Sequence, residues 1–134
     1  MIDSNILCFY AIDNYELTAE VRDILSDYGN RIYVPSKCVE ELIYLQQSGK
    51  IDIKEWKNAE NIIRFINESN FDIKYVAEEH LRTLARLPLI GEHKDMTDRM
   101  AIAQAITEEI PIISSDRKFR SYEKHGLRLV FNDR

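Results

Sequence analysis

The chain contains few residues that break regular structure. Its 134 residues include 4 glycines and 3 prolines, while hydrophobic residues make up 45%. This composition excludes a disordered chain or a long linker, because apolar residues recur throughout. A chain of this length can bury roughly two thirds of its unfolded surface in one core. We therefore predict a single domain over residues 1–134.

Cysteine is scarce, and long apolar runs are absent. Cys8 and Cys38 each lie in an apolar stretch, and neither belongs to a CxxC or CxxH pair. This favours two buried thiols over a disulfide, and it argues against a structural zinc site. No apolar run is long enough to span a bilayer, and the chain opens without a charged-then-apolar leader. We expect no membrane attachment and a cytoplasmic location.

Motifs for side-chain nucleophiles are also missing. The sequence has no Gly-rich phosphate loop, no GxSxG elbow and no Cys–His signature. The histidines His80, His93 and His125 are far apart and show no HxxxH spacing, so we predict surface or capping roles for them. Catalysis through a covalent intermediate is therefore not indicated.

The charge is unevenly distributed along the chain. A net charge of −5 opposes general attraction to nucleic acid. The stretch 110–134, however, carries six bases and three acids. A basic edge beside acidic residues suits a metal-dependent nuclease. A solvated helix face has the same composition, so charge alone does not decide between them.

Apolar spacing predicts helices that alternate with strands. The expected strands are a short one ending near Asp3, then 31–34, 72–76, 111–114 and 127–131. The expected helices are 17–28, one that follows Ser36 as N-cap, one from Asp52 to Ile66, then 78–86, 95–106 and 119–125. This alternation predicts a parallel sheet covered by helices on both sides. Ligands of such sheets bind beyond the carboxyl ends of the strands.

Four carboxylates stand where one element changes into the next: Asp3, Glu41, Asp98 and Asp116. Asp3 ends the first strand and Asp116 follows the strand 111–114, so we expect both to point into the same crevice. Acids that converge repel one another unless a cation lies between them, and a hard divalent ion such as Mg²⁺ is the simplest candidate. Four carboxylates carry a charge of about −4, which two divalent ions about 3.5–4 Å apart could neutralise.

Each acid also has an ordinary structural explanation. Asp3 suits a turn, and Asp116 suits a turn or a helix cap. Asp95 suits an N-cap with Asp98 at the third helical position. The helix behind Asp98 is apolar on nearly all sides, however, which indicates a buried helix with a crowded first turn. An acid in such a place needs a partner.

Glu41 has a neighbouring rival in Glu40. Adjacent residues of a helix face directions about 100° apart, so only one of the two can face the crevice. Both also suit a solvated helix face. The periodicity of the sequence leaves the choice open.

Taken together, these motifs resemble the PIN domain family. The family opens with Asp-Thr-Asn or Asp-Ser-Asn after a strand, and this chain has Asp3-Ser4-Asn5. A helical Glu before Leu or Ile is matched by Glu41-Leu42. The segment from His93 to Ala105 resembles His-x-Asp-Pro-x-Asp-Arg-x-x-Ile-Ala-x-Ala, and Ser114 to Phe119 resembles Thr/Ser-x-Asp-x-x-Phe. The resemblance covers essentially the whole chain and implies an α/β three-layer sandwich, with a central parallel sheet flanked by helices.

In size the chain is similar to the single-domain VapC-type toxins of type II toxin–antitoxin pairs. That resemblance implies Mg²⁺- or Mn²⁺-dependent RNA cleavage, a homodimer, and a small antitoxin that blocks the acidic pocket. Two alternatives share the fold: a housekeeping RNA-processing nuclease and a non-catalytic PIN scaffold used for binding. A phospho-acceptor receiver fits less well, because the first strand is not followed by adjacent acids.

The hypothesis gives each site residue a role. Asp3, Asp98 and Asp116 are the expected metal ligands, and Glu41 completes the site or orients the attacking water. Asp95 is expected to act on the metal indirectly, through a ligand or a water. The residues expected at the RNA substrate are Asn5, Arg99, Ser115 and Lys118, with Arg99 and Lys118 holding phosphate. Without metal the acids should repel, so the pKa of at least one should rise.

Overall fold

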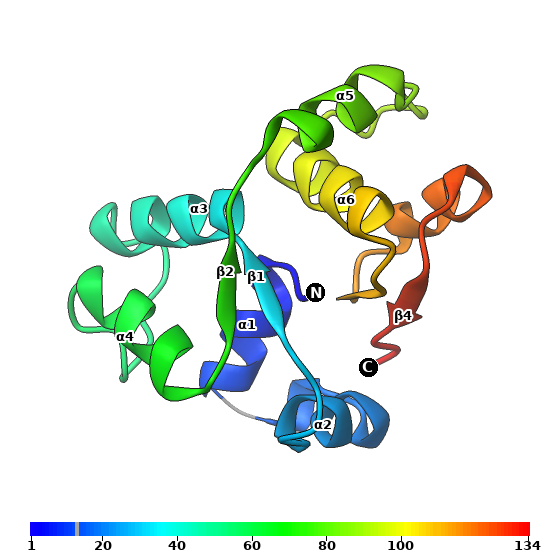
Figure 1. Cartoon of the computed structure of the whole chain (residues 1–134). Helices are drawn as coiled ribbons and strands as arrows, with labels where there is room; N and C mark the ends of the chain where they lie inside the picture. Colours follow the sequence, from blue (N-terminus) through cyan, green and yellow to red (C-terminus); the bar gives the residue numbers. More distant parts are fainter. Residues whose placement is uncertain (13) are drawn as a thin grey trace.

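Parallel strands form the centre of the molecule (Figure 1). The computed structural model describes every residue except residue 13. Strand β1 (Tyr33–Pro35) pairs in parallel with β2 (Asp72–Lys74), and β3 (Ile112–Ser114) pairs in parallel with β4 (Leu129–Phe131). Both pairs are therefore parallel, as the alternation of helices and strands predicts.

The segment Met1-Ile2 joins the two pairs of strands. Ile2 forms a parallel bridge with Ile113, and its N–H donates to the carbonyl of Tyr33 at 3.0 Å. The order across the sheet is thus β2, β1, residues 1–2, β3 and β4. The short first strand expected before Asp3 is present only as this one bridge.

Helices connect and cover the strands. Their bounds are α1 (Ser4–Ile12), η1 (Asn14–Glu16), α2 (Ala19–Ser26), α3 (Ser36–Gln47), α4 (Glu60–Glu68), α5 (Glu78–Arg86), α6 (Met96–Glu108) and η2 (Arg117–His125). Helix α5 has the predicted bounds, and η2, although a 3₁₀ helix, ends at the predicted Gly126. In Figure 1, α5 and α6 pack side by side, and α2 lies at the opposite end of the strands.

Two predicted helix starts are wrong. Asp52 does not begin a helix, because α4 starts at Glu60 after Asn58, whose side chain accepts from the N–H of Asn61. The preceding loop instead folds Ile53 and Trp56 into the core.

Ser36 is the first residue of α3, and its predicted role as the N-cap is not seen. The chain passes directly from β1 into the helix, so Pro35 occupies the cap position and no side chain caps it.

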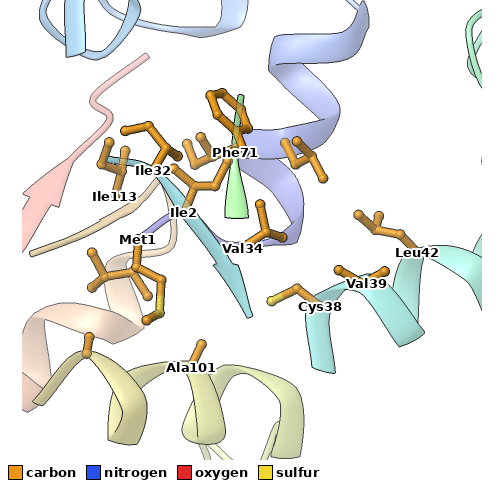
Figure 2. Packing of buried hydrophobic residues seen from close by; sticks show 14 of the residues in the cluster. Met1, Ile2, Ile32, Val34, Cys38, Val39, Leu42, Phe71, Ala101 and Ile113 are labelled. Atoms are coloured by element: carbon orange, nitrogen blue, oxygen red, sulfur yellow. The ribbon is translucent and has the colours of Figure 1, made fainter. Parts of the chain in front are cut away.

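The core lies between the strands and the helices (Figure 2). Ile2, Val34 and Ile113 of the strands are almost fully buried. Figure 2 shows Cys38 of α3 and Ala101 of α6 on the same side of these strand residues. Helix α6 is buried over seven consecutive residues, from Arg99 to Ala105, which agrees with its apolar sequence on all sides. Within the described part of the chain, no helix has the length and apolar character needed to cross a bilayer.

Candidate metal centre

Acidic side chains gather at the carboxyl edge of the sheet. Asp3 follows Ile2, Asp116 follows β3, and Asp98 lies in the first turn of α6. Donor atoms of His93, Asp98 and Asp116 all lie within 4.8 Å of one another. Two of the predicted carboxylates therefore converge within reach of a single ion, together with one imidazole.

Asp3 is buried directly behind this group. Its side chain is 4% exposed, and its Oδ1 accepts from the N–H of Ile6 at 3.0 Å. Burial raises the pKa of Asp3 to about 7, and the negative charges of Asp98 and Asp116 act in the same direction. Hydrogen bonds from Ser114 and from the Ile6 N–H oppose this increase. No cation among the described residues pairs with Asp3, so its charge is compensated only by hydrogen bonds.

Asp98 is half-buried, and its negative charge is also unfavourable in the folded protein. Burial raises its pKa to about 6, the hydrogen bond from His93 lowers it, and the charges of Asp95 and Asp116 raise it. The predicted increase in pKa among these acids is confirmed. Its largest cause is burial, however, and mutual repulsion comes second to it.

The structure separates Glu41 from Glu40. Glu40 is exposed and lies 3.5 Å from the Nζ of Lys37. Glu41 is half-buried, and its charge, like that of Asp3, raises the pKa of both Cys8 and Cys38. Glu41 thus faces the acidic side of the sheet.

Three of the acids also cap helices, which the sequence predicted for Asp95 and Asp116 but not for Asp3, where a turn was expected. Asp95 accepts from the N–H of Asp98 at 2.8 Å, Asp116 accepts from the N–H of Lys118 at 2.9 Å, and Asp3 caps the start of α1. These bonds hold the carboxylates rigidly, and a carboxylate has further lone pairs for a ligand. Capping and metal binding are therefore compatible at Asp3 and Asp116.

His93 was expected on the surface or at a helix end, and this prediction is wrong. Its ring is 5% exposed and lies between Tyr122 and Asp98. The sequence signal that could have identified it is its place five residues before Asp98, inside the family-like segment. For the other two histidines the prediction is confirmed: His125 is exposed, and His80, although buried, accepts from the N–H of Ala77 at the start of α5.

Arg99 does not hold phosphate in the way we predicted. Its guanidinium is buried and donates to the carbonyls of Leu87 and Pro88 and to the hydroxyl of Tyr122. Adjacent residues of a helix face different directions, and the side chain of Arg99, next to Asp98, points into the core. Arg99 therefore secures the loop after α5 to α6.

The other predicted substrate residues lie near the acids. Asn5 and Lys118 are exposed, in the first turns of α1 and η2. Ser115 is half-buried, and its Oγ accepts from Nδ2 of Asn132 at 2.8 Å. Its own hydroxyl hydrogen remains available to an anion. No contact in the structure tests their role at a substrate.

Both cysteines are free thiols, as the sequence predicted. Cys38 is buried, whereas Cys8 is only half-buried. Burial raises the pKa of Cys8 to about 11 and raises that of Cys38 further. Both thiols therefore stay protonated and serve as packing groups beside the acids.

Comparison with known proteins agrees with this arrangement. The family model described as PIN domain matches residues 1–125. The chain belongs to the PIN domain family. Its α/β fold, with helices around parallel strands, is the PIN fold.

A crystal structure of VapBC2 from Rickettsia felis, bound to a DNA fragment from its promoter, has a similar fold. The TM-score is 0.73 at 19% sequence identity, over 99% of this chain and 98% of that chain. No curated protein matches the chain.

Proposed function

We propose that this protein is a divalent-metal-dependent endoribonuclease, which hydrolyses phosphodiester bonds of RNA. The observation that carries the proposal is the convergence of Asp98 and Asp116 within 4.8 Å, next to the buried Asp3. The four acids come from separate parts of the chain, and burying their charges together is costly without a cation. Membership of the PIN family supports the same conclusion.

The donor set fits a hard cation. Carboxylate oxygens are the ligands that Mg²⁺ and Mn²⁺ prefer, and Asp3, Asp98 and Asp116 provide them from three different elements. A divalent ion held there would polarise the phosphate and lower the pKa of a bound water. Glu41, from the side of α3, would complete the site or orient the water. Asp95 would act indirectly, because it fixes the N–H of Asp98.

The rigid parts of the site orient the reacting groups. The hydroxyl of Ser114 is hydrogen-bonded both to Asp3 and to the N–H of Asp116, so it connects two of the proposed ligands. The carboxylates are therefore held before any ligand binds, which lowers the reorganisation needed in the reaction.

A basic surface beside Asp116 suits a phosphate backbone. Arg117 and Lys118 are exposed just after Asp116, and the guanidinium of Arg120 lies 4.3 Å from the ring centre of Phe131. A cavity of about 210 Å³ opens here, lined by Ser115, Arg117, Phe131, Asn132, Asp133 and Arg134. Lys118, with Asn5 and Ser115, would contact the RNA strand next to the acids.

We further propose that the protein is the toxin of a type II toxin–antitoxin pair and acts as a homodimer. Its fold similarity to VapBC2 supports this assignment. A largely apolar cavity of about 370 Å³ near the first turn of α6 is suited to a small antitoxin, and its lining residues are Lys37, Leu84, Met96, Thr97, Arg99 and Met100. Met96 is 85% exposed at its rim. A partner docked there would contact the first turn of α6, the turn that carries Asp98.

The central test is RNA cleavage by the purified protein. Single-stranded RNA should be cut in Mg²⁺ or Mn²⁺ and remain intact in EDTA. Asp98→Asn keeps the size of the side chain and removes its charge, so it should abolish cleavage. Asp23→Asn, on the exposed side of α2, is the matched control and should cleave like the parent protein. Equal cleavage by Asp98→Asn and the parent would refute the proposed site.

Two further measurements separate the alternatives. A toxin should arrest growth when expressed, and the product of a neighbouring small gene should relieve this arrest. A housekeeping nuclease should show neither effect. A scaffold that only binds partners has no reason to bind metal. Its melting temperature should therefore not rise on titration with Mn²⁺, while that of the nuclease should.

A further inference from the structure

A chain of hydrogen bonds leads from the core to the acids. Nη1 of Arg99 donates to the hydroxyl of Tyr122 at 3.3 Å, and that hydroxyl lies 2.8 Å from Nδ1 of His93. On the other side of the ring, Nε2 of His93 lies 3.2 Å from Oδ2 of Asp98. Tyr122, His93 and Arg99 are all at least nine-tenths buried, so water has little access to these bonds.

The direction of each bond follows from its donors. A guanidinium can only donate, so Tyr122 accepts from Arg99. The single hydrogen of Tyr122 is then free for His93, whose Nδ1 must accept it. A neutral imidazole that accepts at Nδ1 carries its hydrogen on Nε2. This hydrogen points to Asp98.

The other protonation states leave a buried group unsatisfied. An imidazolium would donate from both nitrogens, and the hydroxyl hydrogen of Tyr122 would then have no acceptor. The tautomer with its hydrogen on Nδ1 has the same defect, and it also places a lone pair of Nε2 against the carboxylate of Asp98. Ring contacts hold the imidazole in place, because His93 packs edge-on against Tyr122 at 5.5 Å between centroids.

We propose that His93 is a positioning residue for Asp98 and not a ligand of the metal, although its donor atom lies within reach of Asp98 and Asp116. It donates from Nε2 to Oδ2 of Asp98 and thereby fixes this carboxylate, whose Oδ1 would remain available to an ion. Tyr122 and Arg99 fix the tautomer that makes this possible. The role in catalysis rests on the proposed nuclease function, while the tautomer itself does not.

The first test reads the ring nitrogens directly. In ¹⁵N-labelled protein at neutral pH, the His93 ring should show a protonated Nε2 and an unprotonated Nδ1, both before and after saturation with Mg²⁺. The signals are assigned by their loss in His93→Gln. An imidazolium, a hydrogen on Nδ1, or loss of the Nε2 hydrogen when Mg²⁺ is added would overturn the proposal. The spectrum of the metal-free protein tests the tautomer of His93 even if the protein cleaves no RNA.

Variants test the positioning role. His93→Ala should bind Mn²⁺ about 10- to 100-fold more weakly than the parent, as is typical when a group that orients a ligand is lost. His93→Gln should recover part of this affinity, because its amide can donate to Asp98. His125→Ala, at the exposed end of η2, is the control and should leave the affinity unchanged. Equal loss in the Ala and Gln variants would contradict a donor role.

Tyr122→Phe isolates the hydroxyl from the packing of the ring. Removing the hydroxyl frees Nδ1 of His93, so the ring should lose its single tautomer in the ¹⁵N spectrum, and Mn²⁺ affinity should fall. A spectrum unchanged from the parent would show that Tyr122 does not set the tautomer.

Discussion

Ile2 and Ile113 form a parallel bridge, and this contact places Asp3 next to Ser114. The Ser114 hydroxyl is hydrogen-bonded to Asp3 and accepts from the N–H of Asp116 at 3.0 Å. Two acids that are more than a hundred residues apart in the chain therefore share one hydroxyl. The geometry of the proposed metal centre thus depends on strand pairing as well as on the acids themselves.

Asp3 should be required for cleavage but not for the fold. Asp3→Asn keeps an oxygen that can accept from Ile6 and removes a buried charge. We expect cleavage to fall by more than about 100-fold, since even indirect partners of a metal cost 10- to 100-fold. At pH 8 without metal, the melting temperature should equal or exceed that of the parent. Asp3→Ala also loses the cap of α1, which should cost about 1 kcal/mol. Equal destabilisation by both variants would contradict this account.

The stability of the metal-free protein should fall as the pH rises from about 5 to 7. The pKa of Asp3 is raised to about 7 in the folded protein, so folding favours the protonated carboxyl. Its destabilising effect is absent below the unfolded pKa of about 4 and complete above 7. Asp3 alone could contribute up to about 4 kcal/mol at full ionisation.

Urea unfolding at pH 5 and pH 7, in EDTA and in Mn²⁺, measures this effect. Mn²⁺ should restore stability at pH 7, and Asp3→Asn should flatten the pH dependence. Two groups act in the opposite direction. Burial lowers the pKa of the Met1 amino group to about 6, so this group destabilises the folded protein less as the pH rises above 6, and the measurement therefore stops at pH 7. Glu108 limits the window at about pH 5. Its pKa is lowered, chiefly by the hydrogen bond from His80, so its contribution is lost only in more acidic solution. Equal pH dependence of the parent and Asp3→Asn between pH 5 and pH 7 would argue against a buried charge at Asp3.

Arg99 and Lys118 should respond differently to substitution. Arg99→Lys cannot satisfy both Leu87 and Pro88 carbonyls and the Tyr122 hydroxyl, so the free energy of unfolding should fall by about 1–3 kcal/mol. Lys118→Gln should leave the melting temperature unchanged and raise KM for RNA, because its side chain is exposed beside Asp116. Melting curves of both variants measure the change in stability, and steady-state cleavage measures the change in KM. An increase in KM without loss of stability in Arg99→Lys would reinstate it as a phosphate ligand.

The close packing of α6 should not tolerate a larger side chain at Ala101. Ala101 is fully buried and points towards the core in Figure 2. Ala101→Leu should lower the free energy of unfolding by about 1–3 kcal/mol through overpacking. Ala85→Leu, on the exposed face of α5, should change it by less than about 0.5 kcal/mol. Denaturant unfolding of both variants provides the comparison, and a similar effect at the two sites would show that α6 is loosely packed.

Most of the order of helices and strands could be predicted from the sequence because it depends on local patterns, but α1 was not predicted. The spacing of apolar residues identified α5 with its exact bounds and the buried α6. Asp3 and Asp116 could be placed at one edge because parallel strands end on the same side. The start of α4 could not be predicted in this way. The Asp–Glu spacing that begins at Asp52 is the same before a helix and before a loop that fills the core.

Which side chains face the proposed metal centre was decided only by the tertiary structure. Glu41 and Glu40 are equivalent in local pattern, and packing of α3 against its neighbours turned one towards Asp3 and left the other in solvent. His93 became a partner of Asp98 because a tyrosine 29 residues away supplied the hydrogen bond on its other side. Local sequence sets the periodicity of an element, whereas the direction of a side chain depends on what the rest of the chain places beside it.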